Sequence, residues 1–331
     1  MKKVRKAVIT AAGRGTRQYP ASSAVDKEMF PLVDRDGLTK PIIQMIGEEA
    51  IAAGIEEICI VTQPGEETKY REYFQGLSQK LLPAFKGKEW ALEQSSRLEH
   101  FRQILSFVAQ DSPEGFGHAV WCAKEKIGDE PFLLLLGDHI YVSQTDQNCA
   151  TQLTRTWSEA TCNALTAVVP VTEDKLSGVG TIRGRPLEDK PYCYEAQKII
   201  EKPSVEVART ELRTPGLPAG TFLGHFGMHI FSPAIFEVLD RHIRDDVRQR
   251  GEIQLTTAQE ALRAEYGDYL VRHTLGHRYD TGIPYGLMET QLALALNSIH
   301  RRQIIEYIIM ELDRGTSRPP QQTTPPWPPK P

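Results

Sequence analysis

The sequence predicts an α/β fold in which a mostly parallel sheet is flanked by helices. Two observations support this prediction. Short runs of Val, Ile and Leu alternate with longer segments of helical periodicity through the first half of the chain. Glycine or proline separates these segments, as expected at turns and helix ends. Strands that alternate with helices pair in parallel through right-handed crossovers, and ligands of such sheets bind at the carboxyl ends of the strands.

The predicted elements follow from local composition. The strands are apolar, β-branched runs, which favour the pleated conformation. The first helix has Pro41 near its start, apolar residues three and four positions apart, and Gly54 at its end. In chain order we expect a strand at 6–10, a helix at 41–54, a strand at 58–61, a helix at 118–127, and strands at 131–136, 163–171 and 224–231.

The C-terminal part has a different character. A long helical pattern covers 285–309, and its apolar residues could pack on the core or on a second subunit. Seven of the 22 prolines lie within 319–331. A tail of this composition cannot bury enough apolar surface to fold and should sample the polyproline II conformation. We expect residues 315–331 to be disordered, with recognition by a proline-binding partner as the alternative.

Composition excludes several classes of protein. The 331 residues carry a net charge of −4, so no global positive field attracts nucleic acid or an anionic membrane. No apolar stretch approaches the roughly 20 residues of a membrane span. The five cysteines are scattered and include no Cys-x-x-Cys pair. This pattern indicates reduced thiols rather than a disulfide frame or a zinc site, and therefore a cytoplasmic protein.

The segment after the first strand is suited to binding phosphates. Its small residues are Ala11, Ala12, Gly13 and Gly15, which let backbone N–H groups approach an anion. Arg17 and Lys27 add positive charge. The dinucleotide fingerprint needs a third glycine where Gln18 stands, and a P-loop needs Gly-Lys-Ser/Thr, so neither motif fits. Taken alone, the two glycines are more typical of an ordinary turn than of a ligand site, and only the continuation into K-E-M-F-P at 27–31 favours phosphate binding.

Seven short motifs occur in one order along the chain. They are A-A-G-R-G-T-R at 11–17, K-E-M-F-P at 27–31, E-G-F-G-H-A-V at 114–120, L-L-G-D at 135–138, E-K-P at 201–203, G-E-I-Q-L-T at 251–256 and Y-D-T-G at 279–282. From about residue 6 to 297 the chain resembles the sugar-1-phosphate nucleotidylyltransferases, in particular the bacterial UTP–glucose-1-phosphate uridylyltransferases.

The resemblance implies a Rossmann-like, mostly parallel mixed sheet of the nucleotide-diphospho-sugar transferase type. Residues 1–297 would form the catalytic domain, with 175–220 as a smaller sugar-side region, followed by a C-terminal helix at 298–314. The implied reaction joins UTP and glucose-1-phosphate into UDP-glucose and pyrophosphate with Mg²⁺, in a homo-oligomer, either a dimer or a tetramer. Two alternatives remain open: a related enzyme with another base or sugar, such as a thymidylyltransferase, and a catalytically silent subunit that binds nucleotide sugars.

This reaction needs cations and a metal rather than a general base, because the attacking phosphate oxygen is already an anion. Arg17, Lys27 and Lys202 are the expected catalytic cations. Asp138 and Asp280 are the expected magnesium ligands, since Mg²⁺ prefers carboxylate oxygens. The expected nucleotide-binding residues are Ala11, Ala12, Gly13, Gly15, Thr16, Gln110 and Gly115. The expected sugar-binding residues are Gly178, Glu201 and Gly227.

Several of these assignments have a structural alternative. Lys27 could be an exposed lysine, Glu201 and Lys202 a surface ion pair, and Asp280 the cap of the turn before Gly282. We interpret the four histidines that could suggest a metal site as core or loop residues; they are His118, His139, His225 and His229.

The chain also departs from the family pattern near the expected phosphate site. The departures are Ser22-Ser23, Asp26, an insertion at 35–39, His139 directly after Asp138, and Pro284. They leave the principal charged residues in place, but substrate preference or activity could differ from that of the family.

Overall fold

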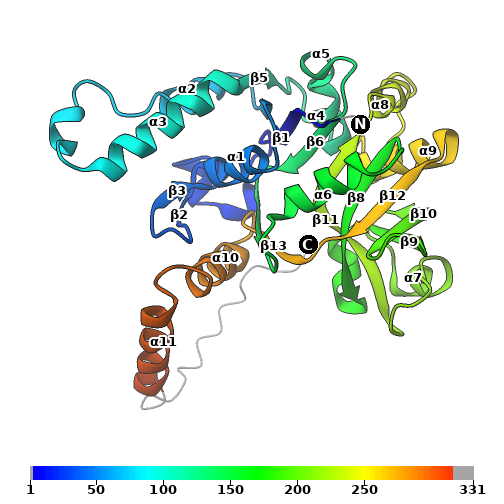
Figure 1. The fold of residues 1–331 in the computed structure, drawn as a ribbon. Helices are drawn as coiled ribbons and strands as arrows, with labels where there is room; N and C mark the ends of the chain where they lie inside the picture. Colours follow the sequence, from blue (N-terminus) through cyan, green and yellow to red (C-terminus); the bar gives the residue numbers. More distant parts are fainter. Residues whose placement is uncertain (1–2, 316–331) are drawn as a thin grey trace.

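The computed structural model describes residues 3–315 and is built around one nine-stranded sheet (Figure 1). Across the sheet the strands are β5 (Leu105–Ala109), β4 (Glu57–Thr62), β1 (Lys6–Thr10), β6 (Phe132–Leu136), β11 (Thr221–Phe231), β8 (Ala164–Thr172), β12 (Tyr269–His273), β10 (Cys193–Ile200) and β9 (Thr181–Pro186). The first four strands pair in parallel, as the alternation of strand and helix predicts. The mixed α/β sheet is confirmed.

Antiparallel pairing begins where β11 enters the sheet. This strand runs antiparallel to both β6 and β8, and it also pairs with β9. β10 is antiparallel to β9 and β12, whereas β12 is parallel to β8. A short connection joins β9 to β10, and only antiparallel neighbours can be linked so briefly. The sheet is therefore parallel on the side formed by the first half of the chain and largely antiparallel on the other side.

Helices cover both faces of the sheet and form two cores. One core includes α1 (Ile42–Ala52) and α6 (Cys149–Ser158), and the other includes α4 (Phe116–Cys122), α8 (Ala234–Arg244) and α9 (Leu255–Tyr266). Successive strand residues project to opposite faces. Accordingly, Ala7 and Ile9 of β1 belong to the first core, while Val8 lies in the second.

The remaining elements lie around the sheet and the helices that cover it. They are α2 (Glu67–Tyr73), α3 (Glu89–Ile104), α5 (Lys124–Ile127), α7 (Val205–Glu211), the hairpin of β2 (Pro31–Val33) and β3 (Thr39–Pro41), the ribbon of β7 (His139–Ser143) and β13 (Gly276–Asp280), and the 3-10 turns η1 (Thr16–Gln18), η2 (Ala21–Ser23), η3 (Lys27–Met29), η4 (Leu82–Phe85) and η5 (Glu173–Gly178). The proposed insertion at 35–39 is the tip of the β2–β3 hairpin. Segment 175–220 supplies β9 and β10, which are strands of the main sheet.

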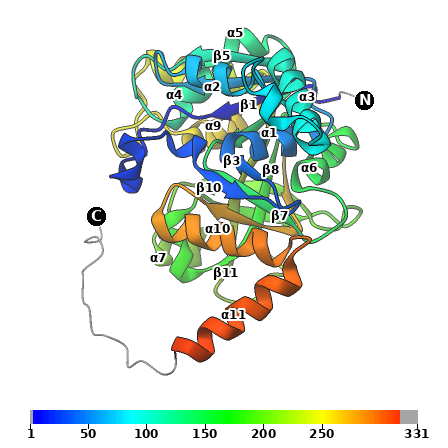
Figure 2. The same cartoon turned by 90° about the vertical axis from the view of Figure 1, so that its left-hand side faces the viewer.

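The expected single helix at 285–309 is wrong, because two helices occupy this region. α10 (Pro284–Leu296) ends before Asn297, and α11 (Arg301–Gly315) projects away from the body in both views (Figures 1 and 2). The Asn297 side chain donates to the carbonyl of Ala293, and the backbone N–H of Ile299 donates to the carbonyl of Arg35 in the hairpin tip. These contacts turn the chain between the helices. The proposed disordered tail, apart from Gly315, lies outside the described residues.

No helix within residues 3–315 has the combination of length and hydrophobicity that crossing a membrane requires.

Candidate active site

The candidate site begins where β1 and β6 end side by side. Their parallel register pairs Thr10 with Leu136, so the loop after β1 lies next to Gly137 and Asp138. The N–H of Gly137 donates to the carbonyl of Thr10 at 2.9 Å. A Cβ at position 137 would lie 2.5 Å from that carbonyl oxygen, so only glycine fits there. This close backbone contact places the Asp138 carboxylate beside the glycine loop.

The glycine loop curves around the side chain of Lys27. A Cβ at Gly13 would lie 3.1 Å from Lys27 Nζ, and Gly15 adopts φ +60°, which favours glycine. Lys27 Nζ donates to Asp138 Oδ2 at 2.6 Å, and the lysine side chain is only 12% exposed. The alternative of an exposed surface lysine is therefore wrong: Lys27 is held between the loop and the end of β6.

The β7–β13 ribbon brings the second carboxylate to the same place. Asp280 lies opposite His139 in the antiparallel register. Both the N–H and the hydroxyl of Thr281 donate to the carbonyl of Asp138 at 2.8 Å, which ties the two strand ends together. Gln18 donates to the carbonyl of Thr281 at 2.6 Å and connects the glycine loop as well.

Gly282 marks the point where the charged groups converge. A Cβ there would lie 2.7 Å from Asp138 Oδ2, 2.9 Å from Asp280 Oδ1 and 3.2 Å from Arg17 Nη2. Arg17 Nη1 lies 3.9 Å from Asp280 Oδ2. Asp280 Oδ1 also accepts from the Gly282 N–H at 2.8 Å, so the turn cap considered above is present in addition to the convergence. Four of the predicted residues, Arg17, Lys27, Asp138 and Asp280, thus meet around one small space.

Burial and neighbouring charges shape the ionisation of this cluster. Burial raises the pKa of Glu28 to about 8, despite the opposing effect of Lys27 3.6 Å away. Burial also disfavours the charged form of Lys27, but Asp138 and Glu28 outweigh it and raise the pKa of Lys27 above its usual value. For Asp138, burial is outweighed by His139 and Lys27, and its pKa is lowered. Burial lowers the pKa of His139 to about 4, so His139 is neutral near pH 7 and Lys27 is the cation that keeps Asp138 ionised.

The residues present fit a divalent cation. Donor atoms of Asp138, His139 and Asp280 all lie within 4.8 Å of one another. Two carboxylates supply the hard oxygen ligands that Mg²⁺ prefers. His139 is not among the metal ligands that the sequence predicts, because its spacing is typical of a core or loop histidine. It is buried, but it also borders the two carboxylates.

A cleft of about 280 Å³ opens beside the glycine loop. Its lining includes Thr10, Ala12, Gly13, Arg14, Lys27, Gln110, Pro113, Gly115, Phe116, Ala119, Leu136, Asp138 and Glu252. Gln110 is buried, and its Nε2 donates to the Gly115 carbonyl at 3.1 Å and lies 3.1 Å from His118 Nδ1. The structure therefore brings together Ala12, Gly13, Gln110 and Gly115, four of the expected nucleotide-binding residues. Ala11, Gly15 and Thr16 lie in the same loop. Gly15 adopts the left-handed conformation there, directly before the 3-10 turn that begins at Thr16.

Glu201 directly follows β10 and forms a second group of polar contacts. Its Oε2 accepts from Thr256 Oγ1 at 2.7 Å, and its side chain is 11% exposed. Lys202 Nζ lies 3.4 Å from Glu201 Oε1 but is 38% exposed, and the Lys202 carbonyl accepts from Arg250. The alternative interpretation, an ion pair between Glu201 and Lys202, is thus compatible with the structure, although Glu201 itself is largely buried.

The expected sugar-binding glycines differ in their surroundings. Gly178 is exposed, and a Cβ there would meet no atom within 4 Å, so its assignment stays a prediction. Gly180 instead carries the close contacts: a Cβ there would lie 2.8 Å from His225 Nδ1 and 3.0 Å from Glu201 Oε2. Gly227, with φ +85°, lies against His139 as part of the irregular segment of β11.

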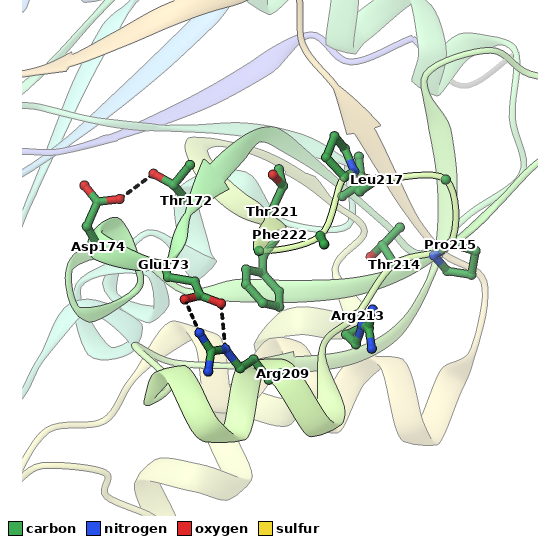
Figure 3. A pocket seen from close by; sticks show the side chains of 14 residues that line it. Thr172, Glu173, Asp174, Arg209, Arg213, Thr214, Pro215, Leu217, Thr221 and Phe222 are labelled. Carbon is green, nitrogen blue, oxygen red and sulfur yellow. Dashed lines mark hydrogen bonds and ion pairs between the residues drawn. The ribbon is translucent and has the colours of Figure 1, made fainter.

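A larger hollow of about 1040 Å³ contains none of the predicted site residues (Figure 3). It lies between η5, α7 and the loop before β11. Arg209 in its wall donates twice to Glu173, and Thr172 donates to Asp174 (Figure 3). These side chains pair with one another, whereas the charged residues of the candidate site converge at the carboxyl ends of the parallel strands.

Comparison with known proteins identifies the family. A model of the nucleotidyl transferases matches residues 6–295. The chain belongs to this family. Among curated nucleotidyl transferases, it is 37% identical over 311 residues to the UTP–glucose-1-phosphate uridylyltransferase of Bacillus subtilis (strain 168), covering 93% of this chain and 97% of the relative. It is 34% identical to the protein of the same name from Streptococcus pneumoniae, covering 94% of this chain and 97% of the relative.

Solved structures of nucleotidyl transferases agree with this assignment. An apo UDP-glucose pyrophosphorylase superposes with a TM-score of 0.73 at 32% identity, covering 88% of this chain and 97% of the other. A UTP-bound UGPase from Acinetobacter baumannii superposes with a TM-score of 0.73 at 25% identity, covering 93% of this chain and 99% of the other.

Proposed function

We propose that this chain is a UTP–glucose-1-phosphate uridylyltransferase, which transfers UMP from UTP to glucose-1-phosphate and releases pyrophosphate. The names of the curated relatives support this reaction, as does the structural neighbour solved with UDP-glucose. The observation that carries the proposal is the convergence of Arg17, Lys27, Asp138 and Asp280 around Gly282, beside the cleft at the end of β1.

In this reaction an oxygen of the sugar phosphate attacks the α-phosphorus of UTP, and the bond to the β-phosphate oxygen breaks. The nucleophile is already ionised near pH 7, so no side chain has to remove a proton. The enzyme must hold two anions in line and stabilise the charge that develops. Lys27 would neutralise charge at the α-phosphate as a point cation, and the planar Arg17 would take two oxygens of the triphosphate. The exposed Lys202 would approach the sugar phosphate.

Two recognition roles follow from the surrounding contacts. The fixed amide of Gln110, together with the backbone of Ala12 and Gly115, would bind the uracil edge within the cleft. Glu201 would accept hydrogen bonds from sugar hydroxyls, with Gly180 and Gly227 leaving the space that the sugar ring needs.

Asp138 and Asp280 would hold the Mg²⁺ ion that nucleotidyl transfer uses. Bound there, the ion would reduce the repulsion between the two phosphorylated substrates. Lys27 contacts Asp138 directly, so its ammonium group already lies beside the proposed metal position.

The proposed setting is a cytoplasmic homo-oligomer, either a dimer or a tetramer. All five cysteines are free, which suits a reducing compartment. The projecting α11 exposes Tyr307, Ile309 and Leu312, and we propose this helix as a subunit contact. The oligomeric state can be measured by light scattering.

A coupled pyrophosphate-release assay tests the proposed reaction. UTP with glucose-1-phosphate should be turned over, and dTTP or other sugar phosphates should react more slowly. A higher kcat/KM with dTTP would instead identify a thymidylyltransferase. Lys27→Ala should lower kcat by about 10²-fold or more, because it removes a cation preorganised at the reacting phosphate. Binding of UDP-glucose without turnover of any substrate pair would establish the silent subunit.

A further inference from the structure

His139 is placed against the carboxylate pair by the register of the ribbon. It is the first residue of β7 and lies directly opposite Asp280, so the two side chains share one face of the ribbon. Asp138 precedes it in the chain. The donor atoms of the three side chains lie within 4.8 Å of one another, and the His139 side chain is only 5% exposed.

The imidazole has an unmet hydrogen-bonding group. Nδ1 of His139 is buried and has no partner among residues 3–315. By contrast, His118 lies 3.1 Å from the Gln110 amide and His229 lies 3.0 Å from Thr166 Oγ1, so these two buried histidines have protein partners. A buried polar nitrogen without a partner is costly, and at a functional site it points to a missing ion or ligand.

The backbone around His139 leaves room for its ring. A Cβ at Gly227 would lie 2.9 Å from His139 Nδ1, and φ +85° at this position favours glycine. Tyr141 donates to the Gly227 carbonyl at 2.8 Å and fixes this segment of β11 beside the ring. The imidazole is thus held in a shaped space next to two carboxylates, and no protein group fixes its tautomer through Nδ1.

We infer that His139 is a third protein ligand of the divalent cation and that it shifts the preference of the site from Mg²⁺ toward Mn²⁺. Mg²⁺ favours oxygen ligands and rarely takes imidazole. Mn²⁺ is the weakest binder of the divalent first-row ions, but it shares the preference of Mg²⁺ for carboxylates and accepts an imidazole beside them more readily. One imidazole beside two carboxylates is therefore a donor set for a transition metal. This inference rests on the metal site of the proposed function. It adds His139 as a ligand and Mn²⁺ as the preferred ion.

The test measures metal binding directly. Chelator-treated, full-length protein is titrated with Mn²⁺ and with Mg²⁺ by calorimetry, with and without UDP-glucose, and bound Mn²⁺ is examined by pulsed electron paramagnetic resonance. A coordinated imidazole gives a ¹⁴N coupling that carboxylate and phosphate oxygens do not give. We expect this coupling in the wild type and its loss in His139→Asn, together with a drop in Mn²⁺ affinity of about tenfold and little change for Mg²⁺. His277→Asn is the matched control, because His277 is an exposed histidine on β13.

The outcomes separate this inference from the proposed function. Mn²⁺ that binds without ¹⁴N coupling, and equally well to His139→Asn, would overturn the role of His139 while leaving a carboxylate site intact. Failure of Mn²⁺ to bind at all would also overturn it. Turnover of UTP and glucose-1-phosphate is measured separately with Mg²⁺. A protein that shows the ¹⁴N coupling but no turnover would support His139 as a metal ligand and contradict the proposed reaction.

Discussion

Replacing Gly282 with alanine tests the convergence of charged groups most directly. The new methyl carbon would lie 2.7 Å from Asp138 Oδ2 and 2.9 Å from Asp280 Oδ1. An ordinary carbon–oxygen contact is about 3.3 Å or longer, so both carboxylates must retreat by roughly half an ångström. Their displacement would disturb the 2.6 Å contact between Lys27 and Asp138. Because a misplacement of about 1 Å can cost about 10²-fold in rate, a displacement of roughly half that size should cost on the order of tenfold, or about 1.4 kcal/mol of transition-state stabilisation.

The assay is steady-state pyrophosphate release with both substrates varied. We expect the loss in kcat, because in the proposed reaction the displaced groups act on the reacting phosphates. The fold should tolerate the change, since Gly282 does not have a positive φ. Lys86→Ala is the control, because Lys86 is an exposed residue in the loop before α3 and belongs to none of the predicted sites. Unchanged kcat and KM in Gly282→Ala, with the control also unchanged, would refute the view that reaction chemistry takes place at this point.

Three further predictions address separate parts of the structure. Gly180→Ala should raise the KM for glucose-1-phosphate by about tenfold without affecting the KM for UTP, because its methyl group would displace Glu201. Equal effects on both KM values in initial-rate kinetics would argue against a role of this position in sugar binding. Gln110→Ala should weaken UTP binding by about tenfold and reduce discrimination against CTP, as competition assays would measure. Burial raises the pKa of Glu28 to about 8 from 4.5 in the unfolded chain, so the wild type should lose stability as pH rises between these values, by about 5 kcal/mol at most. Glu28→Gln should remove this slope in urea unfolding at pH 5 and pH 8, and identical slopes in the two proteins would contradict the assignment.

Local sequence was sufficient to predict the strands that carry the candidate site. The apolar runs at 6–10 and 131–136 became β1 and β6, whose parallel pairing brings Lys27 and Asp138 together. Apolar runs and glycine positions are short-range features, and tertiary packing did not override them. The meeting of Arg17 with Asp280 followed from family motifs, since nothing local connects positions so far apart in the chain.

Long-range contacts decided what the sequence left undetermined. Gly178 and Gly180 are two residues apart, and only the packing of His225 and Glu201 distinguishes them. The break between α10 and α11 depends on a hydrogen bond to the Arg35 carbonyl in the hairpin. Likewise, His139 became a candidate ligand only through its register opposite Asp280. None of these pairings leaves a periodic signal in the sequence.

The β7–β13 ribbon has a consequence for how the protein is made. Residues 139–143 pair with 276–280, so the second strand of the ribbon is synthesised long after the first. At a translation rate of roughly 5–20 residues per second, the nascent chain spends on the order of ten seconds or more with Asp138 in place and its partner strand not yet made. A ribosome-bound intermediate can therefore assemble the parallel part of the sheet, but the candidate site is complete only once residues 276–280 have been synthesised.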